Sequence, residues 1–462
     1  MRSKITWSVV IVVTMAVLTL NGLGAHLKPM THAGEWTWES GADSLNQNGA
    51  YGQLGVAGLG NVPGARVYAS TWTDGQGTLW LFGGYGYDSA GNGESGDLND
   101  LWKYQSGEWT WMGGSNLVEQ PGTYGTRRQP SGSNVPGARY QATSWTDVAG
   151  NFWLFGGLGI DSKGTRGYLN DLWRYSNGGW TWMAGSKRAF VSGTALTKIP
   201  TARVSASSWS DLQGNLWLFG GDGFDSTGTP GILNDLWRFS KGKWNWVGGS
   251  NLANHMGKYG TKGRPGRNNV PGARTFAVTW TDAKGDLWLF GGLGNDKNGR
   301  LCERVPNPCD LNDLWKYSAG MWTWVGGSNK SQQWGTYGTQ DVASPENMPG
   351  ARDSAISWTD AAGNFWLFGG FGYDSSGIYY GDMNDLWEFS GGEWTWVSGP
   401  NLAGETGTYG IEGVPSPDNV PGCRDSAVEW IDPAGNLWFF GGTDRLTVPN
   451  GGKFNDLWEY QP

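Results

Sequence analysis

Short runs of apolar and aromatic residues alternate with polar, glycine-rich stretches along most of the chain, and the same runs return in the same order. An aromatic run of the form LWLFGG is followed by a loop, then by NDLW, then by a tryptophan pair such as WTW. Copies of this series begin at Leu79, Phe152, Leu216, Leu287, Phe365 and Leu437. Repetition of one supersecondary unit determines the fold class before any local detail does.

Each copy contains four strand-like pieces. The first follows the pattern R-x-x-A-x-x-W, opened at intervals of about 70 residues by Arg66, Arg139, Arg203, Arg274, Arg352 and Arg424. The other three are the LWLFGG, NDLW and WTW pieces. All four are short and aromatic, and glycines separate them, which is typical of antiparallel strands joined by turns. Four strands repeated at this period predict the blades of a β-propeller.

The two ends of the chain complement each other. The chain stops at Pro462, after its sixth NDLW piece and without a sixth tryptophan pair, whereas an unpartnered EWTW stands at Glu35 to Trp38. We therefore predict an all-β fold over residues 35–462, a six-bladed β-propeller of four-stranded antiparallel blades. In this prediction the last blade is closed by the N-terminal strand that carries Trp36 and Trp38, which leaves no open edge between blades.

The first residues have a different character. Arg2 and Lys4 precede an apolar run from Ile5 to Leu20 and then small residues up to Ala25. This order predicts that residues 1–25 are a signal peptide or an N-terminal anchor, and that the protein is secreted, periplasmic or on the cell surface. Any contact with a membrane would then run only through an uncleaved N-terminal segment. A net charge of -8 without a basic run argues against a nucleic-acid partner.

Three cysteines are present. Cys302 and Cys309 lie in one loop, and in an exported protein this proximity predicts a disulfide. Half of a metal site is the alternative, but no histidine stands nearby to complete one. Cys423 replaces an alanine in a repeated PGAR phrase, which predicts a buried small apolar residue.

The double glycine, the NDLW with its following aromatic residue, and the later glycine and tryptophan resemble the kelch repeat. The resemblance covers Trp36 to Tyr460. It implies a β-propeller, in which these copies are longer than most kelch repeats. It leaves function open, since kelch propellers bind proteins, bind sugars or catalyse reactions.

The loops that join the second strand to the third, and the fourth to the next copy, share one face in this topology. They are the long loops, so we expect ligands to bind there. The six repeat arginines either surround the channel mouth, as equivalent arginines do in kelch domains that bind acidic peptides, or pair with the aspartates of NDLW. Equal numbers at equal positions favour pairing. Tyrosines in five of the connecting loops are expected to anchor them (Tyr51, Tyr124, Tyr259, Tyr337 and Tyr409).

Aspartates also recur in a G-x-D pattern at Asp88, Asp161, Asp225, Asp296 and Asp374. Calcium (Ca²⁺) binding is one interpretation, because oxygen-rich loops suit it. Capping of a turn by the side chain is the simpler one, since a full set of carboxylates is missing. We therefore predict no metal centre and no cofactor.

Residues that occur once are better candidates for ligand binding than residues shared by all copies. Trp334, in a connecting loop beside glutamines, is either a stacking platform for a sugar or a packing residue. His255, Lys187 and Arg188 stand in neighbouring loops, and the last two lie in the loop that lacks the tyrosine. A second, less specific set could support acid–base catalysis near the channel: Arg352, Asp353, Arg424, Asp425 and Glu429.

Three functions remain open. The first is an exported, non-catalytic propeller that binds a glycan or a protein through its long loops. The second is a metal-independent isomerase or mutarotase of an acidic sugar, which the resemblance to exported kelch mutarotases implies. The third is an envelope or surface assembly protein. A copper radical oxidase, the best-known kelch enzyme class, is excluded because it needs two histidine ligands and the propeller region holds only His255.

Overall fold

The computed structural model describes residues 34–190, 199–299, 309–378, 380–445 and 451–462. Within these ranges the regular structure is entirely β-strand, and no helix there has the length and apolarity to span a bilayer. The predicted leader and Cys302 lie outside the described residues.

The strands fall into six successive units. Unit 1 holds β2 (Arg66–Val67), β3 (Ser70–Thr73), β4 (Leu79–Tyr87), β5 (Ser95–Gln105) and β6 (Glu108–Gly113). Unit 2 holds β7 (Arg139–Tyr140), β8 (Thr143–Thr146), β9 (Phe152–Phe155), β10 (Leu158–Ile160), β11 (Arg166–Tyr168), β12 (Leu172–Ser176) and β13 (Gly179–Ala184). Unit 3 holds β14 (Arg203–Val204), β15 (Ser207–Ser210), β16 (Leu216–Phe224), β17 (Pro230–Ser240) and β18 (Lys243–Gly248).

The remaining units follow the same order. Unit 4 holds β19 (Arg274–Thr275), β20 (Val278–Thr281), β21 (Leu287–Phe290), β22 (Leu293–Gly294), β23 (Leu314–Ser318) and β24 (Met321–Gly326). Unit 5 holds β25 (Arg352–Asp353), β26 (Ile356–Thr359), β27 (Phe365–Tyr373), β28 (Tyr380–Ser390) and β29 (Glu393–Ser398). Unit 6 holds β30 (Val428–Ile431), β31 (Leu437–Phe440), β32 (Thr443–Asp444), β33 (Gly452–Lys453) and β34 (Leu457–Gln461), together with β1 (Glu35–Ser40).

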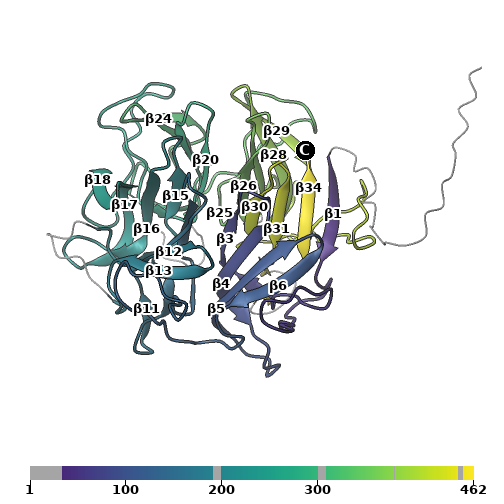
Figure 1. Cartoon of the computed structure of the whole chain (residues 1–462). Coiled ribbons are helices and arrows are strands. Elements are labelled where there is room, and N and C mark those ends of the chain that lie inside the picture. Colours follow the sequence, from purple (N-terminus) through teal and green to yellow (C-terminus); the bar gives the residue numbers. More distant parts are fainter. Residues whose placement is uncertain (1–33, 191–198, 300–308, 379, 446–450) are drawn as a thin grey trace, which may run out of the picture.

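Strand pairing in each unit is antiparallel and follows chain order, as in β3-β4-β5-β6 of unit 1. Unit 6 takes its outer strand from the other end of the chain. β1 pairs with β34, with Glu35 opposite Gln461 and Trp38 opposite Trp458, and the two strands lie side by side in Figure 1. Residues more than 400 positions apart therefore share one sheet.

The inner strand of each unit is broken, whereas the sequence predicts a single piece after the arginine. The break falls two residues after the arginine, at six non-glycine residues with positive φ: Tyr68, Gln141, Ser205, Phe276, Ser354 and Ser426. Such a backbone costs roughly 1–2 kcal/mol per residue. It turns the N–H of each residue towards the carbonyl of the corresponding residue in the preceding unit. These bonds run from 68 to 426, 141 to 68, 205 to 141, 276 to 205, 354 to 276 and 426 to 354, which makes a closed ring.

Aromatic residues, many of them repeated tryptophans, pack one unit against the next. Trp72 of unit 1 stacks on Phe152 of unit 2 at 5.3 Å, and its indole donates to the Trp153 carbonyl. Units 6 and 1 are joined in the same way, since Trp430 donates to the Trp80 carbonyl. Fully burying a large side chain contributes roughly 1.5–3 kcal/mol, so these interfaces form the core.

The double glycine after the second strand lets adjacent units approach. Gly83 has φ 66°, and a Cβ there would lie 2.8 Å from the carbonyl oxygens of Arg139 and Leu98. Any side chain at this position would push unit 2 away from unit 1, which explains why every LWLFGG variant ends in glycine.

Candidate functional site

Each repeat arginine is used in a buried ion pair with the aspartate of NDLW. The six pairs have N–O distances of 2.6 to 2.8 Å: Arg66–Asp100, Arg139–Asp171, Arg203–Asp235, Arg274–Asp313, Arg352–Asp385 and Arg424–Asp456. The pairing that the equal spacing favours is confirmed.

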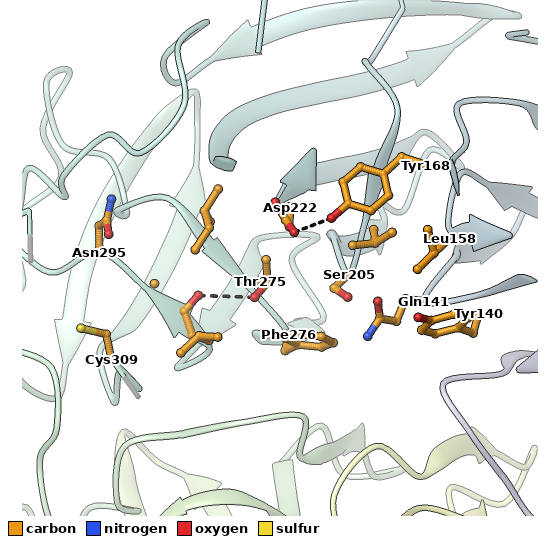
Figure 2. A pocket seen from close by; sticks show the side chains of 14 residues that line it. Tyr140, Gln141, Leu158, Tyr168, Ser205, Asp222, Thr275, Phe276, Asn295 and Cys309 are labelled. Carbon is orange, nitrogen blue, oxygen red and sulfur yellow. Dashed lines mark hydrogen bonds between the residues drawn. The ribbon is translucent and has the colours of Figure 1, made fainter. Parts of the chain in front are cut away.

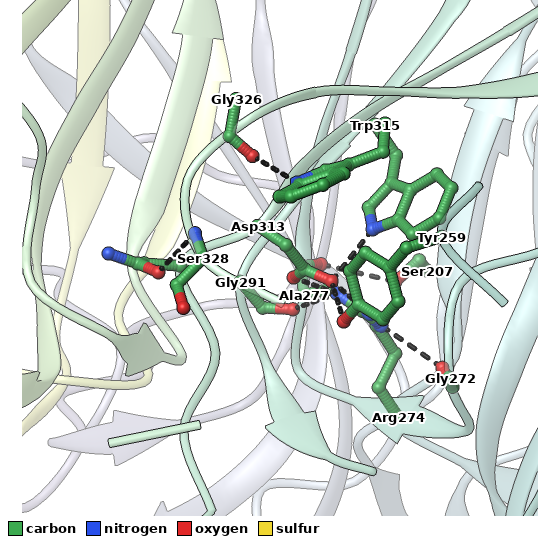
Figure 3. A network of polar contacts seen from close by, with 12 residues as sticks. Ser207, Tyr259, Gly272, Arg274, Ala277, Gly291, Asp313, Trp315, Gly326 and Ser328 are labelled. Atoms are coloured by element: carbon green, nitrogen blue, oxygen red, sulfur yellow. Dashed lines mark hydrogen bonds and ion pairs between the residues drawn. The ribbon is translucent and has the colours of Figure 1, made fainter. Parts of the chain in front are cut away.

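Further donors complete each pair, as Figure 3 shows around Asp313. Arg274 binds both carboxylate oxygens of Asp313, and the Tyr259 hydroxyl and the Trp315 indole both donate to Oδ2. Tyr51, Tyr124, Tyr337 and Tyr409 donate to their aspartates in the same way. The five tyrosines therefore anchor their loops, as predicted.

This pairing bears on two residues of the proposed acid–base set. Arg352 and Arg424 are buried and satisfied by Asp385 and Asp456. Removing a buried guanidinium from its pair costs several kcal/mol. The geometry therefore gives both arginines the structural role that all six share, in which the guanidinium is buried and held by its aspartate.

Asp353 and Asp425 of the same set do meet, in a group of charged residues that we call the mouth cluster: Asp310, Asp353, Asp382, Asp425 and Arg445. All four carboxyl groups are buried. Nε of Arg445 lies 2.6 Å from Oδ2 of Asp425, and its backbone N–H donates to Asp382 at 2.6 Å. Its guanidinium also lies 4.8 Å from the centre of the Phe371 ring.

The carboxyl groups of the mouth cluster influence one another electrostatically in two pairs, Asp310 with Asp353 and Asp382 with Asp425. Burial raises the pKa of Asp382 to about 9, and the charge of Asp425 adds to this effect. Burial also raises the pKa of Asp310, with Asp353 as the neighbouring charge. Two like charges in close contact cannot both ionise freely, so burial and the neighbouring charge together favour the protonated form of Asp310 and of Asp382.

Two aromatic rings lie at the level of the backbone ring. Tyr68 of unit 1 and Phe276 of unit 4 have ring centres 5.5 Å apart. The Tyr68 hydroxyl lies 3.5 Å from Nη2 of Arg445. Because units 1 and 4 are three steps apart in the ring, the two side chains meet across it and separate the mouth cluster from the channel below.

A pocket of about 320 Å³ opens on the same side, between units 2, 3 and 4. Figure 2 shows Phe276 and Tyr140 near one another along one edge of it and Tyr168 above them. The Tyr168 hydroxyl donates to Asp222 at 2.8 Å. Apolar side chains of Leu158, Ile232 and Leu293 share the lining with polar Gln141, Ser205, Thr275 and Asn295. Mixed apolar walls with a few placed polar groups are typical of small-molecule sites.

Two polar atoms of this lining have no hydrogen-bond partner in the described structure. They are Nδ2 of Asn295 and Oγ of Ser205, both buried. An unsatisfied buried donor costs roughly 1–3 kcal/mol. Rotation of either side chain towards the pocket would let a ligand with hydroxyl oxygens remove that cost.

The four predicted ligand-binding residues lie apart from the pocket lining. Trp334 is 37% exposed and contacts Tyr373 edge-on at 4.9 Å, so it has both a packing contact and a free face. His255 lines a different groove, beside β18. Lys187 and Arg188 are exposed at unit 2, where Arg188 lies 3.9 Å from Asp161. Their roles remain predictions.

Glu429 faces the channel below the aromatic pair. It occupies the position that holds Thr71, Ser144, Ser208, Thr279 and Ser357 in the other inner strands. Burial raises its pKa to about 7. It is therefore separated from Asp353 and Asp425, with which the sequence groups it.

The G-x-D aspartates cap turns in the five loops. Asp88, Asp161, Asp225, Asp296 and Asp374 each accept the backbone N–H two residues on, at 2.7 to 2.8 Å. No group of three or more metal-binding side chains occurs among the described residues. Cys423 is buried and free, as predicted. Cys309 is buried, but its predicted partner Cys302 is not described, so the disulfide stays a prediction.

Three residues of the mouth cluster carry only a weak signal in the sequence. Asp310, Asp382 and Arg445 belong to loops and strand ends that differ between copies. Only the register of the sheets, in which Asp382 lies opposite Phe371 next to Arg352 and Asp353, brings them together. Comparison of equivalent positions across the copies would have shown that three of the six carry an acid here: Asp97, Asp310 and Asp382.

Comparisons with known proteins add little to this geometry. The chain matches no family model and no curated protein. Among solved structures, the one titled "Structure of YjhT" aligns with a TM-score of 0.49 and 14% identity, over 88% of this chain and 95% of the other. A fungal alcohol oxidase of the AA5 family, in complex with copper, aligns with a TM-score of 0.43 and 12% identity, over 90% of this chain and 76% of the other. Likenesses at this level carry no argument about function.

The described strands define an all-β protein built from many four-stranded antiparallel sheets, which fits a β-propeller.

Proposed function

We propose that this chain is an exported, six-bladed kelch-type β-propeller that binds an uncharged glycan at the mouth of its central channel without transforming it. The six units are its blades, and β1 closes the last blade. Three observations support the closed ring: the six backbone bonds among the positive-φ residues, the pairing of β1 with β34, and the bond from the Gly442 N–H to the Arg66 carbonyl. Export rests on the character of residues 1–25.

The observation that carries ligand binding is the pair of unsatisfied polar atoms, Asn295 Nδ2 and Ser205 Oγ, in the lining of the pocket. Beside them stand the aromatic faces of Tyr140 and Phe276. Sugars present hydroxyl oxygens at their edges and C–H groups on their faces, so they match donors next to aromatic rings.

The charged side chains near the pocket favour an uncharged sugar over an acidic one. Among the described residues that line the pocket, Asp222 is the one carboxylate and none is a cation. Arg445, the cation of the mouth cluster, already binds Asp425. The described carboxylates would repel the negative charge of an acidic sugar, which is unfavourable in a partly buried site.

A glycan array tests this proposal with the wild-type protein and the Asn295→Asp variant, which replaces a donor by an acceptor of the same shape. We expect the wild type to retain neutral glycans and the variant to lose at least tenfold in affinity, roughly 1.4 kcal/mol. Asn298→Asp is the matched control, because it makes the same charge change at an exposed position of the same loop. Equal glycan binding by both variants and the wild type would contradict the proposal.

The array also discriminates the other predicted sites and functions. Loss of glycan signal in Trp334→Ala, with Asn295→Asp unaffected, would move the sugar site to the connecting loop. Silence on every glycan, with a protein partner recovered by pull-down, would support the surface assembly function instead.

The sugar isomerase has one observation in its favour. Asp382 holds a proton at neutral pH beside the carboxylate of Asp425, which is an arrangement that general acid–base catalysis uses. NMR measurement of anomerisation decides between binding and catalysis, with D-galactose and N-acetylneuraminate as probes. A rate that rises with wild-type protein and falls in Asp382→Asn would establish catalysis, and no change with either probe would support binding alone.

A further inference from the structure

Five of the six outer strands are covered by a segment that we call a strap. Each strap runs from a tyrosine to an asparagine in the loop that precedes its unit: Tyr51–Asn61, Tyr124–Asn134, Tyr259–Asn269, Tyr337–Asn347 and Tyr409–Asn419. The outer strands that they cover are β6, β13, β24, β29 and β1.

The five straps make the same contacts. The asparagine side chain donates to the carbonyl of the first tryptophan of the outer strand, at 3.0 to 3.2 Å (Trp109, Trp180, Trp322, Trp394 and Trp36). A strap N–H donates to the carbonyl of the second tryptophan, at 2.7 to 2.9 Å (Trp111, Trp182, Trp324, Trp396 and Trp38). The strap tyrosine packs edge-on against that second tryptophan, at 5.2 to 5.5 Å.

Unit 3 departs from this pattern. Its preceding loop is shorter and has no Tyr-Gly pair, and residues 191–198 of that loop lie outside the described residues. The second tryptophan of β18, Trp246, is 54% exposed, and in the described structure the carbonyls of Trp244 and Trp246 accept no bond from a strap. The side chain of Asp235, which has no tyrosine partner, is 10% exposed, whereas its five counterparts are fully buried.

A groove of about 380 Å³ begins at the end of β18. It is lined by Val247 and Gly248 on one side and by strap 4, Tyr259–Asn269, with its neighbours on the other. The lining includes His255, Lys258 and Arg267 and contains no carboxylate. Lys243 is exposed on β18 itself. The edge is therefore basic in a chain whose net charge is -8.

We propose that β18 is a docking edge for an extended, acidic peptide segment of another protein, which adds to it as a strap. The partner's N–H groups would bind the Trp244 and Trp246 carbonyls, an aromatic residue would pack on Trp246, and its carboxylates would face Lys258 and Arg267. Addition of a peptide to an exposed sheet edge is a general recognition mode, in which backbone bonds supply affinity and side chains supply specificity.

The chain's own straps supply matched probes. A peptide of residues 401–422 carries the strap 6 pattern with Glu405, Glu412 and Asp418 and no lysine or arginine. A peptide of residues 251–272 carries the strap 4 pattern with Lys258, Lys262, Arg264 and Arg267 and no carboxylate. The two peptides share the tyrosine and asparagine spacing and differ in the sign of their charge.

We expect the full-length protein to bind the fluorescent 401–422 peptide, measured by anisotropy, and to bind the 251–272 peptide at least tenfold more weakly. Trp246→Ala should weaken binding of the first peptide at least tenfold. The Lys258→Glu, Arg267→Glu double variant should abolish its preference over the second. Leu59→Ala, at an 88% exposed position of strap 1, is the control and should change nothing.

Unchanged affinity in Trp246→Ala would overturn the docking edge, and equal binding of both peptides would overturn the acidic partner. Neither peptide binding, with a dimer in sedimentation that Trp246→Ala dissociates, would show that a second copy of the chain occupies β18. Since Trp246 is exposed, its substitution should leave the melting temperature within ~2 °C of wild type, which separates lost docking from misfolding.

Discussion

The ring of Tyr68 lies 5.5 Å from the ring of Phe276, although the two residues belong to units on opposite sides of the backbone ring. Phe276 also lines the pocket between units 2, 3 and 4, and both residues line the channel beneath. This aromatic pair therefore lies between the pocket and the channel, and it forms the floor of the mouth.

Loss of one ring of this aromatic pair should weaken glycan binding at the proposed site. Phe276→Ala deletes one wall of the pocket and opens it to the channel, so we expect at least tenfold weaker binding of any neutral glycan that the array identifies. Titration calorimetry measures the loss. Thr279→Ala, which changes a residue further down the same channel, is the control, and an equal loss in both variants would mean that the pocket floor is irrelevant.

Substitutions in the buried network around Asp313 should lower the free energy of unfolding by clearly different amounts. Arg274→Ala leaves a buried carboxylate without its charged partner, which costs about 3–5 kcal/mol. Tyr259→Phe removes a single hydrogen bond from a carboxylate that retains Arg274 and Trp315, which costs about 1–3 kcal/mol. Urea unfolding followed by tryptophan fluorescence gives both values. If Tyr259→Phe proved the more damaging change, the arginine would not be the centre of the network.

The repeat explains why much of this architecture is readable from the sequence. The strands recur with their glycines, the arginines and aspartates occur in equal numbers, and EWTW stands alone at the start, so the pairings of Arg274 with Asp313 and of β1 with β34 follow from counting. The break at Tyr68 does not follow, because residues as different as tyrosine, glutamine and serine adopt positive φ there. The bonds between units, which no local pattern encodes, hold that conformation.

The mouth cluster could not be predicted from the sequence, for a similar reason. Asp353 and Asp425 are visible as acids next to repeat arginines, but Asp310, Asp382 and Arg445 reach them only through the fold. Trp334 and His255 are candidates for ligand binding because each occurs in only one copy, and the structure places them in separate loops. Residues that occur in only one copy therefore indicate unusual loops, but they do not indicate which side chains come together in one site.

The proposed ring closure can be locked covalently. Glu35 and Gln461 are directly opposed in the pairing of β1 with β34, at a Cα separation typical of antiparallel neighbours and compatible with a disulfide. We expect the Glu35→Cys, Gln461→Cys double variant to form that bond under oxidising conditions and to unfold at a higher temperature than its reduced form, since closing so long a loop contributes about 4 kcal/mol or more. Scanning calorimetry with and without reductant measures the effect.

Glu35→Cys alone is the control for this experiment and should not respond to reductant in the same way. Failure of the double variant to crosslink, with a mass spectrum that shows both thiols free, would mean that β1 does not stay paired with β34 in solution.

Glu429 should make stability depend on pH. Burial raises its folded-state pKa to about 7 from the ordinary 4.5, so between these values the folded state binds more protons than the unfolded state. Its contribution is fully present below pH 4.5 and is lost as pH rises towards 7. Glu429→Thr places a small hydroxyl residue at this position, as in the other five units, of which two carry threonine and three carry serine, and removes the titration. We expect the variant to match the wild type at pH 4.5 and to exceed it by ~1–3 kcal/mol at pH 8, measured by urea unfolding at both values. Ser357→Thr, at the equivalent position of unit 5, should leave the pH dependence unchanged. Parallel curves for wild type and Glu429→Thr would show that the carboxylate is fully hydrated in the channel.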